Sequence, residues 1–331
     1  MNERLLVELR NGIMECEHQG AICAVDEHGQ VKYSLGDIEA PRFLRSAGKP
    51  FQLIPSIKHG IIEHYHLNDK DIALMMSSHR GEDMHMETLD HIMHQCELTE
   101  SALQCAESYP LHGRSREQWI RHGGDPSKRF HNCSGKHFGV LSWCKLEGYD
   151  LDSYMDPNHP AQQAMTAAIM EMSETKPEQA VSGTDGCGFP VYALPLKHIA
   201  TAYLKLACPD LITDPDTRRA VEIIGQAMNA HPLLIGGTNR LDSILMEDSN
   251  IVAKGGFKGI FGFALREERL GFAVKIADGA DEECAYVVTS LLKQINYKCK
   301  ETISRLESVF SSNILNDQGL VVGESRSVFQ L

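Results

Sequence analysis

Apolar and polar residues alternate near both ends of the chain, whereas apolar residues recur at helical spacing in its middle. Alternation with a period of two predicts strands over residues 4–9 and 21–35, with a hairpin turn at 26–30. The same reasoning predicts a C-terminal hairpin from residues 250–264 and 270–277. No strong signal follows residue 312. The two ends of the chain are therefore expected to supply the sheet.

The middle of the chain, residues 51–245, is predicted to consist of helices and loops. Helical spacing marks residues 51–59, 84–97, 131–148, 160–174, 194–206 and 215–229. A further helix is predicted over 280–294, with Asp281, Glu282 and Glu283 in its first turn, where carboxylates interact favourably with the helix dipole. Strands at both ends with helices between them predict an α+β protein, a single domain over 1–331.

Composition narrows the range of functions. The chain has 331 residues with 42% hydrophobic and 23% charged, and its net charge of −13 repels phosphate backbones and anionic lipid heads. We expect neither nucleic acid nor a membrane as partner. There is no run of 18 apolar residues and no apolar leader at the start, so neither a transmembrane helix nor a secretory signal is expected. Ten cysteines without a Cys-x-x-Cys pair then indicate reduced thiols and a cytoplasmic protein.

A serine stands three residues before a lysine in the segment Ser46-Ala47-Gly48-Lys49-Pro50. A lysine that is held neutral can take the proton of a serine and turn it into a nucleophile. The same spacing occurs at other sites, for example Ser173 and Lys176, so the pair alone carries little weight. Pro50 lacks an N–H and disfavours regular helix before it, which predicts a tight turn from Ser46 into the helix that follows.

Two later segments continue the order found in serine–lysine acyl-transfer enzymes: a second serine loop, then a lysine beside glycine on a strand. Ser78 can relay a proton, and Lys254 can add positive potential that keeps Lys49 neutral. Each also has a plainer interpretation. Ser78 can simply cap a turn, and Lys254 can be a solvated strand lysine, with Lys258 as a competing source of charge.

Other polar side chains lie in glycine-bearing segments. Asp185 can cap a turn or hold a substrate ammonium group, and His79 and His137 can bind metal or simply hydrogen-bond within loops. Cys133 and Cys187 are candidates for metal binding, although two thiols are too few for a closed zinc site. Cys133 near a helix start, with histidines beside it, is also a rival nucleophile.

Four motifs in order identify a resemblance. Residues 45–52 (RSAGKPFQ), 78–82 (SHRGE), 131–137 (HNCSGKH) and 185–190 (DGCGFP) together resemble the rhizobial-type (thermolabile, inducible) L-asparaginase family. The resemblance covers nearly the whole chain, from Arg10 and His18 near the start to Asp278-Gly279. It implies a fold like that of serine β-lactamases and glutaminases, and a homodimer.

The resemblance also implies a set of site residues for hydrolysis of L-asparagine to L-aspartate and ammonia. Ser46 would pair with Lys49, and Ser78 with Lys254. Asp185 would bind the substrate ammonium group, and Arg45, His79 and His137 would be further substrate-binding residues. A zinc ion is implied as well, and the ligands expected for it are Cys133, Lys136 and Cys187.

Two departures from the family pattern add positive charge. Arg80 stands where the family usually has serine, and Lys258 lies where an acid is usual. They bear on substrate preference more than on reaction class. Two alternatives therefore stay open: a glutaminase or other serine–lysine amidase, and a zinc-binding protein with little or no catalytic activity.

Overall fold

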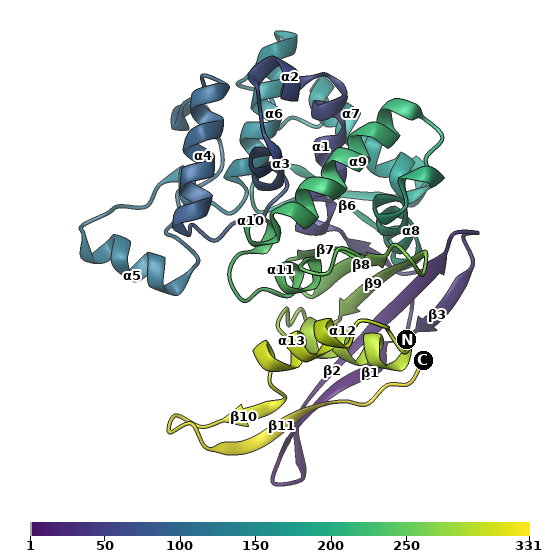
Figure 1. Ribbon diagram of the computed structural model, residues 1–331. Coiled ribbons are helices and arrows are strands. Elements are labelled where there is room, and N and C mark those ends of the chain that lie inside the picture. The colour runs from purple at the N-terminus through teal and green to yellow at the C-terminus, as the bar shows by residue number, and fades with distance from the viewer. Residues whose placement is uncertain (1) are drawn as a thin grey trace.

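The computed structural model describes residues 2–331 and confirms the α+β class, with strands from both ends of the chain in one sheet. The sheet order is β10-β11-β1-β2-β9-β8-β7, and β3 pairs with β2 outside this path. Strands β1 and β11, from opposite ends of the chain, lie side by side in this sheet (Figure 1). The strands are β1 (Glu3–Arg10), β2 (Ile13–Asp26), β3 (Val31–Leu35), β7 (Ile251–Gly256), β8 (Ile260–Leu265), β9 (Leu270–Ile276), β10 (Asn313–Leu315) and β11 (Val321–Ser327).

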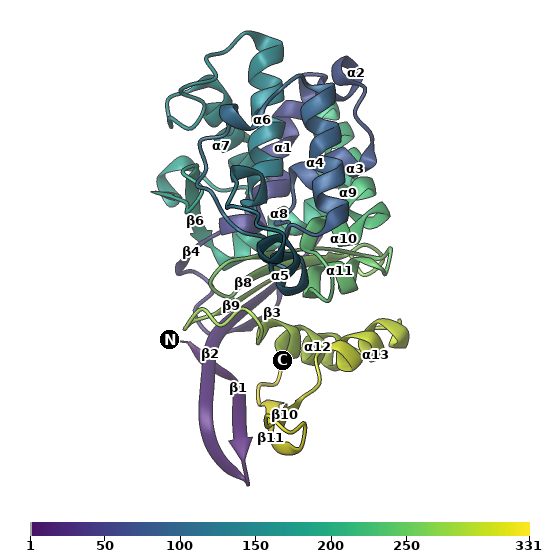
Figure 2. The same ribbon diagram turned by 90° about the vertical axis from the view of Figure 1, so that its left-hand side faces the viewer.

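Most helices lie on one side of this sheet, while α12 and α13 lie on the other (Figure 2). The predicted helical middle is thereby confirmed. Within the described residues, no helix has the length and apolar character needed to cross a membrane. The helices are α1 (Lys49–Lys58), α2 (Ile61–Tyr65), α3 (Asp69–Met75), α4 (Asp83–Gln95), α5 (Gly113–Arg121), α6 (Ser134–Glu147), α7 (Pro160–Ser173), α8 (Leu196–Ala207), α9 (Pro215–Ala230), α10 (Pro232–Gly236), α11 (Leu241–Met246), α12 (Cys284–Gln294) and α13 (Lys300–Val309).

Helix α8 lies directly on the sheet and contacts β2, β8 and β9. Two strand glycines make this close approach possible. A Cβ on Gly271 would lie 2.2 Å from the Ala200 carbonyl oxygen, and one on Gly262 would lie 2.0 Å from the Tyr203 ring. Because real Cβ atoms do not approach other atoms so closely, the glycines fix how near α8 and Tyr203 come to the centre of the sheet.

Three parts of the chain differ from the sequence prediction. The segment 250–264 is not one strand but two, β7 and β8, joined by a tight turn in which Lys258 has a positive φ of 70°. The tail after residue 312 forms β10 and β11, which pair with each other, and β11 also pairs with β1. A separate small sheet consists of β4 (Pro41–Phe43), β6 (Pro190–Pro195) and β5 (Val181–Thr184).

Candidate active site

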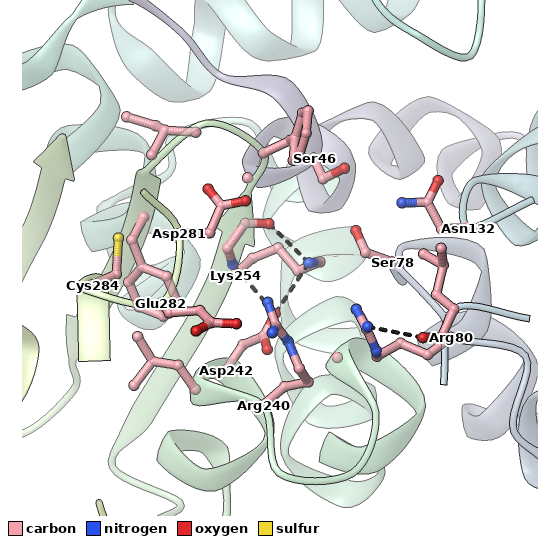
Figure 3. A pocket seen from close by; sticks show the side chains of 18 residues that line it. Ser46, Ser78, Arg80, Asn132, Arg240, Asp242, Lys254, Asp281, Glu282 and Cys284 are labelled. Carbon is pink, nitrogen blue, oxygen red and sulfur yellow. Dashed lines mark hydrogen bonds and ion pairs between the residues drawn. The ribbon is translucent and has the colours of Figure 1, made fainter. Parts of the chain in front are cut away.

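A cavity of about 350 Å³ lies between the start of α1, the loop after α3 and strand β7 (Figure 3). It gathers side chains from segments far apart in the sequence, from Ser46 to Cys284. The hydroxyl groups of Ser46 and Ser78 and the amine of Lys254 turn toward the same space. The polar residues that line it are Ser46, Ser78, Arg80, Asn132, Arg240, Asp242, Lys254, Asp281 and Glu282.

Ser46 lies on a single 3-10 turn, Arg45–Gly48, which leads directly into α1. The sequence prediction of a tight turn before Pro50 is confirmed. Arg45 has a φ of 50°, a conformation that costs energy for a residue with a side chain. Gly256 of β7 lets the turn pack against the sheet, because a Cβ there would lie 2.7 Å from the Leu44 carbonyl oxygen. The fold thus holds Ser46 half-buried at the cavity wall.

Lys49 is 1% exposed, and no carboxylate contacts its amine within residues 2–331. Its Nζ lies 2.5 Å from the Ser77 carbonyl oxygen, 3.3 Å from that of Asn132 and 3.2 Å from Ser78 Oγ. A neutral amine has two N–H donors and one lone pair. In the structure Nζ donates to all three oxygens. A neutral amine would keep its two bonds to the carbonyls and accept the third from the Ser78 hydroxyl.

Electrostatics favour the neutral form of this lysine. Burial lowers the pKa of Lys49 from its usual value, and the positive charges of Lys136 and Lys254 lower it further. The Cys133 sulfur opposes the shift without reversing it. A lysine with this depressed pKa is suited to accept a proton from a hydroxyl group.

The pairing of serines with lysines differs from the expected one. Lys49 was expected to pair with Ser46, but its amine bonds Ser78 instead. Among residues 2–331, the Ser46 side chain makes no hydrogen bond. The reason is geometric: Lys49 begins α1 and its long side chain runs into the buried layer behind the cavity, where Ser77 and Ser78 present their oxygens.

Lys254 is equally buried at 1% exposure, but it has an acidic partner. Its Nζ lies 3.1 Å from Asp242 Oδ2 and 2.9 Å from the Gly255 carbonyl oxygen. Burial alone would raise the pKa of Asp242, yet Lys254 and Arg240 outweigh it and hold that pKa low. The pair is a buried salt bridge at the cavity wall rather than the expected contact between Lys254 and Ser78.

Tyr203 of α8 contacts both the turn before Lys49 and the strand that carries Lys254. Its hydroxyl lies 2.7 Å from the Ala47 carbonyl oxygen and 3.2 Å from that of Lys254. Its ring also packs edge-on against Phe51, with centroids 5.4 Å apart. The turn that carries Ser46 and the strand that carries Lys254 are therefore fixed to the same buried side chain.

The two residues expected to bind substrate charges are bound to each other. Arg45 Nε lies 2.7 Å from Asp185 Oδ1, and neither residue lines the cavity. Burial would raise the pKa of Asp185, but Lys136 and Arg45 hold it below its usual value. Asp185 also starts a turn in which Gly188 has a φ of 92°. The pair is a fixed part of the wall behind Ser46.

Two arginines face the cavity without an ion-pair partner among residues 2–331. Arg80 and Arg240 both turn their guanidinium groups toward the centre of Figure 3, and Arg80 hydrogen-bonds only the Leu111 carbonyl oxygen. Burial lowers the pKa of Arg80, and the nearby charge of Arg240 lowers it further.

The sequence analysis noted Arg80 only as a departure from the family pattern, and it missed Arg240 and Asp242 as cavity residues. The turn at Gly236-Gly237, which exposes backbone just before them, was the available signal.

The carboxylates before α12 also serve the cavity. The helix predicted from residue 280 begins at Cys284, so Asp281 and Glu282 precede it and line the cavity instead of its first turn. Asp281 accepts a hydrogen bond from the Gly259 backbone N–H, which draws it toward the β7–β8 turn. An acidic run before an apolar helix is ambiguous in sequence, and here the tertiary contact decides its role.

His79 and His137 lie in buried networks outside the cavity lining. The Gly81 N–H donates to His79 Nδ1, so His79 Nε2 donates to Ser134 Oγ at 2.7 Å. Burial holds the pKa of His79 well below its usual value. His137 Nδ1 lies 2.6 Å from the Tyr154 hydroxyl, while its Nε2 is buried without a hydrogen-bond partner. Burial lowers the pKa of His137 to about 4. Both rings are neutral structural groups at neutral pH.

Cys133, Lys136 and Cys187 come together behind the cavity, each 5% exposed or less. Lys136 Nζ lies 3.1 Å from Cys187 Sγ. Hydrogen bonding with Cys187 lowers the pKa of Cys133 well below its usual value, and the same contact raises that of Cys187. Burial would lower the pKa of Lys136, but the two sulfurs raise it.

The sulfur atoms of Cys133 and Cys187 are soft donors suited to a metal such as zinc, provided that further donors are available. Within residues 2–331, no third histidine, cysteine or carboxylate completes the two sulfurs within 4.8 Å. A metal held here would need the Lys136 amine as a further ligand, and that amine can bind a metal only after losing its proton. The donor set fits a zinc-class ion once Cys187 and Lys136 are deprotonated.

Comparison with known proteins assigns the chain a family. The family model described as L-asparaginase II matches residues 6–327. No curated protein matches the chain.

Several solved structures are distantly similar to the chain. A mutant of simvastatin synthase from Aspergillus terreus is 14% identical with a TM-score of 0.43, over 87% of this chain and 91% of that one. A putative β-lactamase from Bacteroides dorei is 10% identical with a TM-score of 0.42, over 83% and 93%. Mglu in its native form is 15% identical with a TM-score of 0.39, and the match covers 84% of this chain but 60% of that one.

Proposed function

This chain belongs to the L-asparaginase II family, which makes it an amidohydrolase, and we propose that it hydrolyses L-asparagine to L-aspartate and ammonia. The observation that carries the proposal is the meeting of two serines and a charged lysine at one cavity, with a second, carboxylate-free lysine behind it. Amide hydrolysis needs a nucleophile, a proton acceptor and a group that stabilises developing negative charge, and each is available there.

In the proposed reaction, Ser46 Oγ attacks the side-chain amide carbon of the substrate. Its proton passes through the Ser78 hydroxyl to the neutral amine of Lys49, the path that the 3.2 Å contact between Ser78 and Lys49 supports. Backbone N–H groups at the start of the turn Arg45–Gly48 stabilise the oxyanion, typically by about 2.7–4 kcal/mol for each donor. Lys254 adds positive potential at the same wall.

The proton then returns along the same path to the leaving nitrogen, the C–N bond breaks and ammonia departs. The acyl group remains as an ester on Ser46. A water molecule, deprotonated by the same relay, attacks that ester, releases aspartate and restores the Ser46 hydroxyl. Overall, one water is consumed for each ammonia and aspartate formed.

We assign recognition of the amino-acid part of the substrate chiefly to the cavity-facing charges. Arg80 and Arg240 together suit an α-carboxylate, because they are the guanidinium groups at the cavity and neither forms a salt bridge with a carboxylate among residues 2–331. Glu282 suits the α-ammonium group. The expected binders Arg45 and Asp185 neutralise each other, so we propose that they shape the wall behind Ser46.

We further propose that Cys133, Lys136 and Cys187 hold a zinc-class ion. When bound, the ion supplies a fixed positive charge behind the cavity. Asp185 and Lys49 both lie within the electrostatic reach of this cluster, so the ion would affect their protonation. Binding requires loss of protons from Lys136 and Cys187, so its affinity should rise with pH. The homodimer and the cytoplasmic location remain predictions.

The decisive experiment compares Ser46→Ala and Ser78→Ala in ammonia release from L-asparagine and L-glutamine. We expect Ser46→Ala to lose on the order of 10⁴-fold or more in kcat, as removal of a nucleophile does. Ser78→Ala should lose less, about 10²–10³-fold, because it removes a relay rather than the bond-forming atom. Metal content is measured on the same samples.

Rapid acid quenching followed by peptide mass mapping locates the acyl group. An adduct on Ser46 that survives in Ser78→Ala supports the assignment, whereas an adduct on Ser78 would reverse the two roles. Wild-type ammonia release by Ser46→Ala would refute the mechanism altogether. Faster turnover of glutamine than of asparagine would keep the mechanism and change the substrate.

A further inference from the structure

A second cluster of metal-ligating side chains lies away from Cys133 and Cys187, where β1, β2 and the segment before α12 meet. Glu8 lies on β1 and His18 lies on β2, while Glu283 is the residue immediately before α12. One ligand atom from each lies within 4.8 Å of the other two. The proposed asparaginase mechanism uses none of them.

His18 is the fixed member of this cluster. It is 6% exposed, and its Nδ1 lies 2.7 Å from Asp278 Oδ2. The other oxygen of Asp278 accepts from the Ala280 N–H at 3.0 Å, so the carboxylate itself is held in place. A carboxylate that accepts from one imidazole nitrogen leaves the other with a lone pair and a set direction, as in many metal-binding histidines.

The other nitrogen of His18, Nε2, contacts the Cys16 thiol through a long hydrogen bond and faces an oxygen of Glu8 beyond hydrogen-bond distance. Nε2 lies 3.6 Å from Glu8 Oε1 and 3.7 Å from Cys16 Sγ. Zinc–nitrogen and zinc–oxygen bonds are about 2.0–2.2 Å long, which places neighbouring ligands of a tetrahedral ion roughly 3.3 Å apart. The three ligand atoms lie within 4.8 Å of one another, so they would have to approach each other by at most about 1.5 Å to surround an ion.

Charge supplies the second argument. Two carboxylates, Glu8 and Glu283, face one another across a mostly buried histidine, with Asp278 behind it. This arrangement concentrates negative charge that a divalent cation would neutralise. Neither Glu8 nor Glu283 has an ion pair with a lysine or arginine within residues 2–331.

We propose that Glu8, His18 and Glu283 form a structural site for a divalent transition ion of the zinc class, with Asp278 as the residue that orients His18. Imidazole favours zinc and its neighbours over magnesium and calcium, which prefer oxygen ligands alone. Cys16 lies close enough to contribute a fourth, softer donor after a small movement. The site is separate from the cysteine cluster and from the reacting groups.

The position of the site suggests that a bound ion would hold one wall of the catalytic cavity in place. The segment 278–283 joins β9 to α12, and Asp281 and Glu282 within it line the catalytic cavity. Asp278 at its start binds His18, and Glu283 at its end would bind the ion on the other nitrogen of the same ring. A bound ion would tie both ends of this cavity wall to the β1–β2 hairpin.

The test is the zinc stoichiometry of the full chain after equilibrium dialysis against Zn²⁺, measured in wild type, His18→Gln and Glu8→Gln. His28→Gln is the matched control, because His28 is exposed on the turn that follows β2. We expect one equivalent to be lost in His18→Gln and Glu8→Gln and kept in His28→Gln. Asp278→Asn should keep the ligands but weaken Zn²⁺ binding by about 10–100-fold.

A second measurement guards against misfolding and against confusion with the cysteine cluster. In a Cys133→Ser, Cys187→Ser background, one equivalent of Zn²⁺ should still bind, raise Tm and resist excess Mg²⁺ or Ca²⁺. Glu8→Gln keeps the bond between His18 and Asp278, so it should fold and still lose the Tm shift. Equal zinc content in wild type, His18→Gln and Glu8→Gln would overturn the proposal. A lower Tm in His18→Gln with unchanged zinc content would also overturn it, leaving His18 as an ion-pair partner only.

Discussion

The first turn of α1 and strand β7 each bury a lysine to the same extent and give it opposite surroundings. Lys49 and Lys254 are both 1% exposed. Lys49 meets two carbonyl oxygens and a hydroxyl group, while Lys254 meets the Asp242 carboxylate at 3.1 Å. The first setting can be satisfied by a neutral amine, whereas the second needs an ammonium ion.

The difference shows that burial alone does not assign a chemical role. Taking an ammonium ion out of water is costly, and a protein can offset that cost with a carboxylate or avoid it by removing the proton. The fold uses both solutions within one cavity. Lys254 keeps its charge, and that charge is one of the reasons that the pKa of Lys49 is low.

The largest effect should come from replacing the neutral lysine. Lys49→Met removes the proton acceptor, so we expect kcat for asparagine to fall by about 10³–10⁴-fold. Lys49→Arg is the matched variant: it keeps a long cationic side chain that cannot deprotonate, and it should be as inactive as Lys49→Met. Ammonia release checks both. Substantial activity in Lys49→Arg would show that this lysine acts through its charge, and the contrast with Lys254 would fail.

A smaller effect, roughly 10–100-fold at neutral pH, is expected for Lys254→Met. Loss of the positive charge raises the pKa of Lys49, since Lys254 is one of the groups that lower it. Activity needs neutral Lys49 and so appears above that pKa. The acidic limb of kcat/KM should therefore move to higher pH, measured at matched metal content.

Stability separates this electrostatic effect from misfolding. Lys254→Met leaves the Asp242 carboxylate buried and unpaired, which should cost about 3–5 kcal/mol of unfolding free energy. The double variant Lys254→Met, Asp242→Asn removes the pair and should recover much of that loss while keeping the shifted limb. If the acidic limb of the kcat/KM profile stayed at its wild-type pH in both variants, Lys254 would not affect the pKa of Lys49.

The smallest effect concerns the side chain that joins the two regions. Tyr203→Phe leaves the Ala47 and Lys254 carbonyls without their shared hydroxyl, so we expect a loss of about 1–2 kcal/mol in unfolding free energy and less than tenfold in kcat. Tyr297→Phe is the control, because its hydroxyl bonds Asp248 outside the cavity. It should lose similar stability and no activity. Equal kcat losses in the two variants would deny Tyr203 a positioning role.

Much of the architecture could be predicted because it depends on local patterns. Alternating residues near both ends and helical spacing between them predicted the sheet and the helical middle. Turn chemistry before Pro50 predicted the bend that carries Ser46. The predictions that failed depend on contacts beyond their own segments: residues 250–264 turn back at Lys258, and α12 begins at Cys284 because Asp281 is drawn to Gly259.

The sequence alone determined which chemical groups this protein has and the order in which they occur. Ser46, Lys49, Ser78 and Lys254 could be singled out because a serine nucleophile, a base and a charge have recognisable residue types. Their partners were decided only by the tertiary structure. Lys49 bonds Ser78, Lys254 bonds Asp242, and Arg240 rather than Arg45 faces the cavity. A long side chain can reach several groups around it, and packing between segments far apart in sequence selects among them.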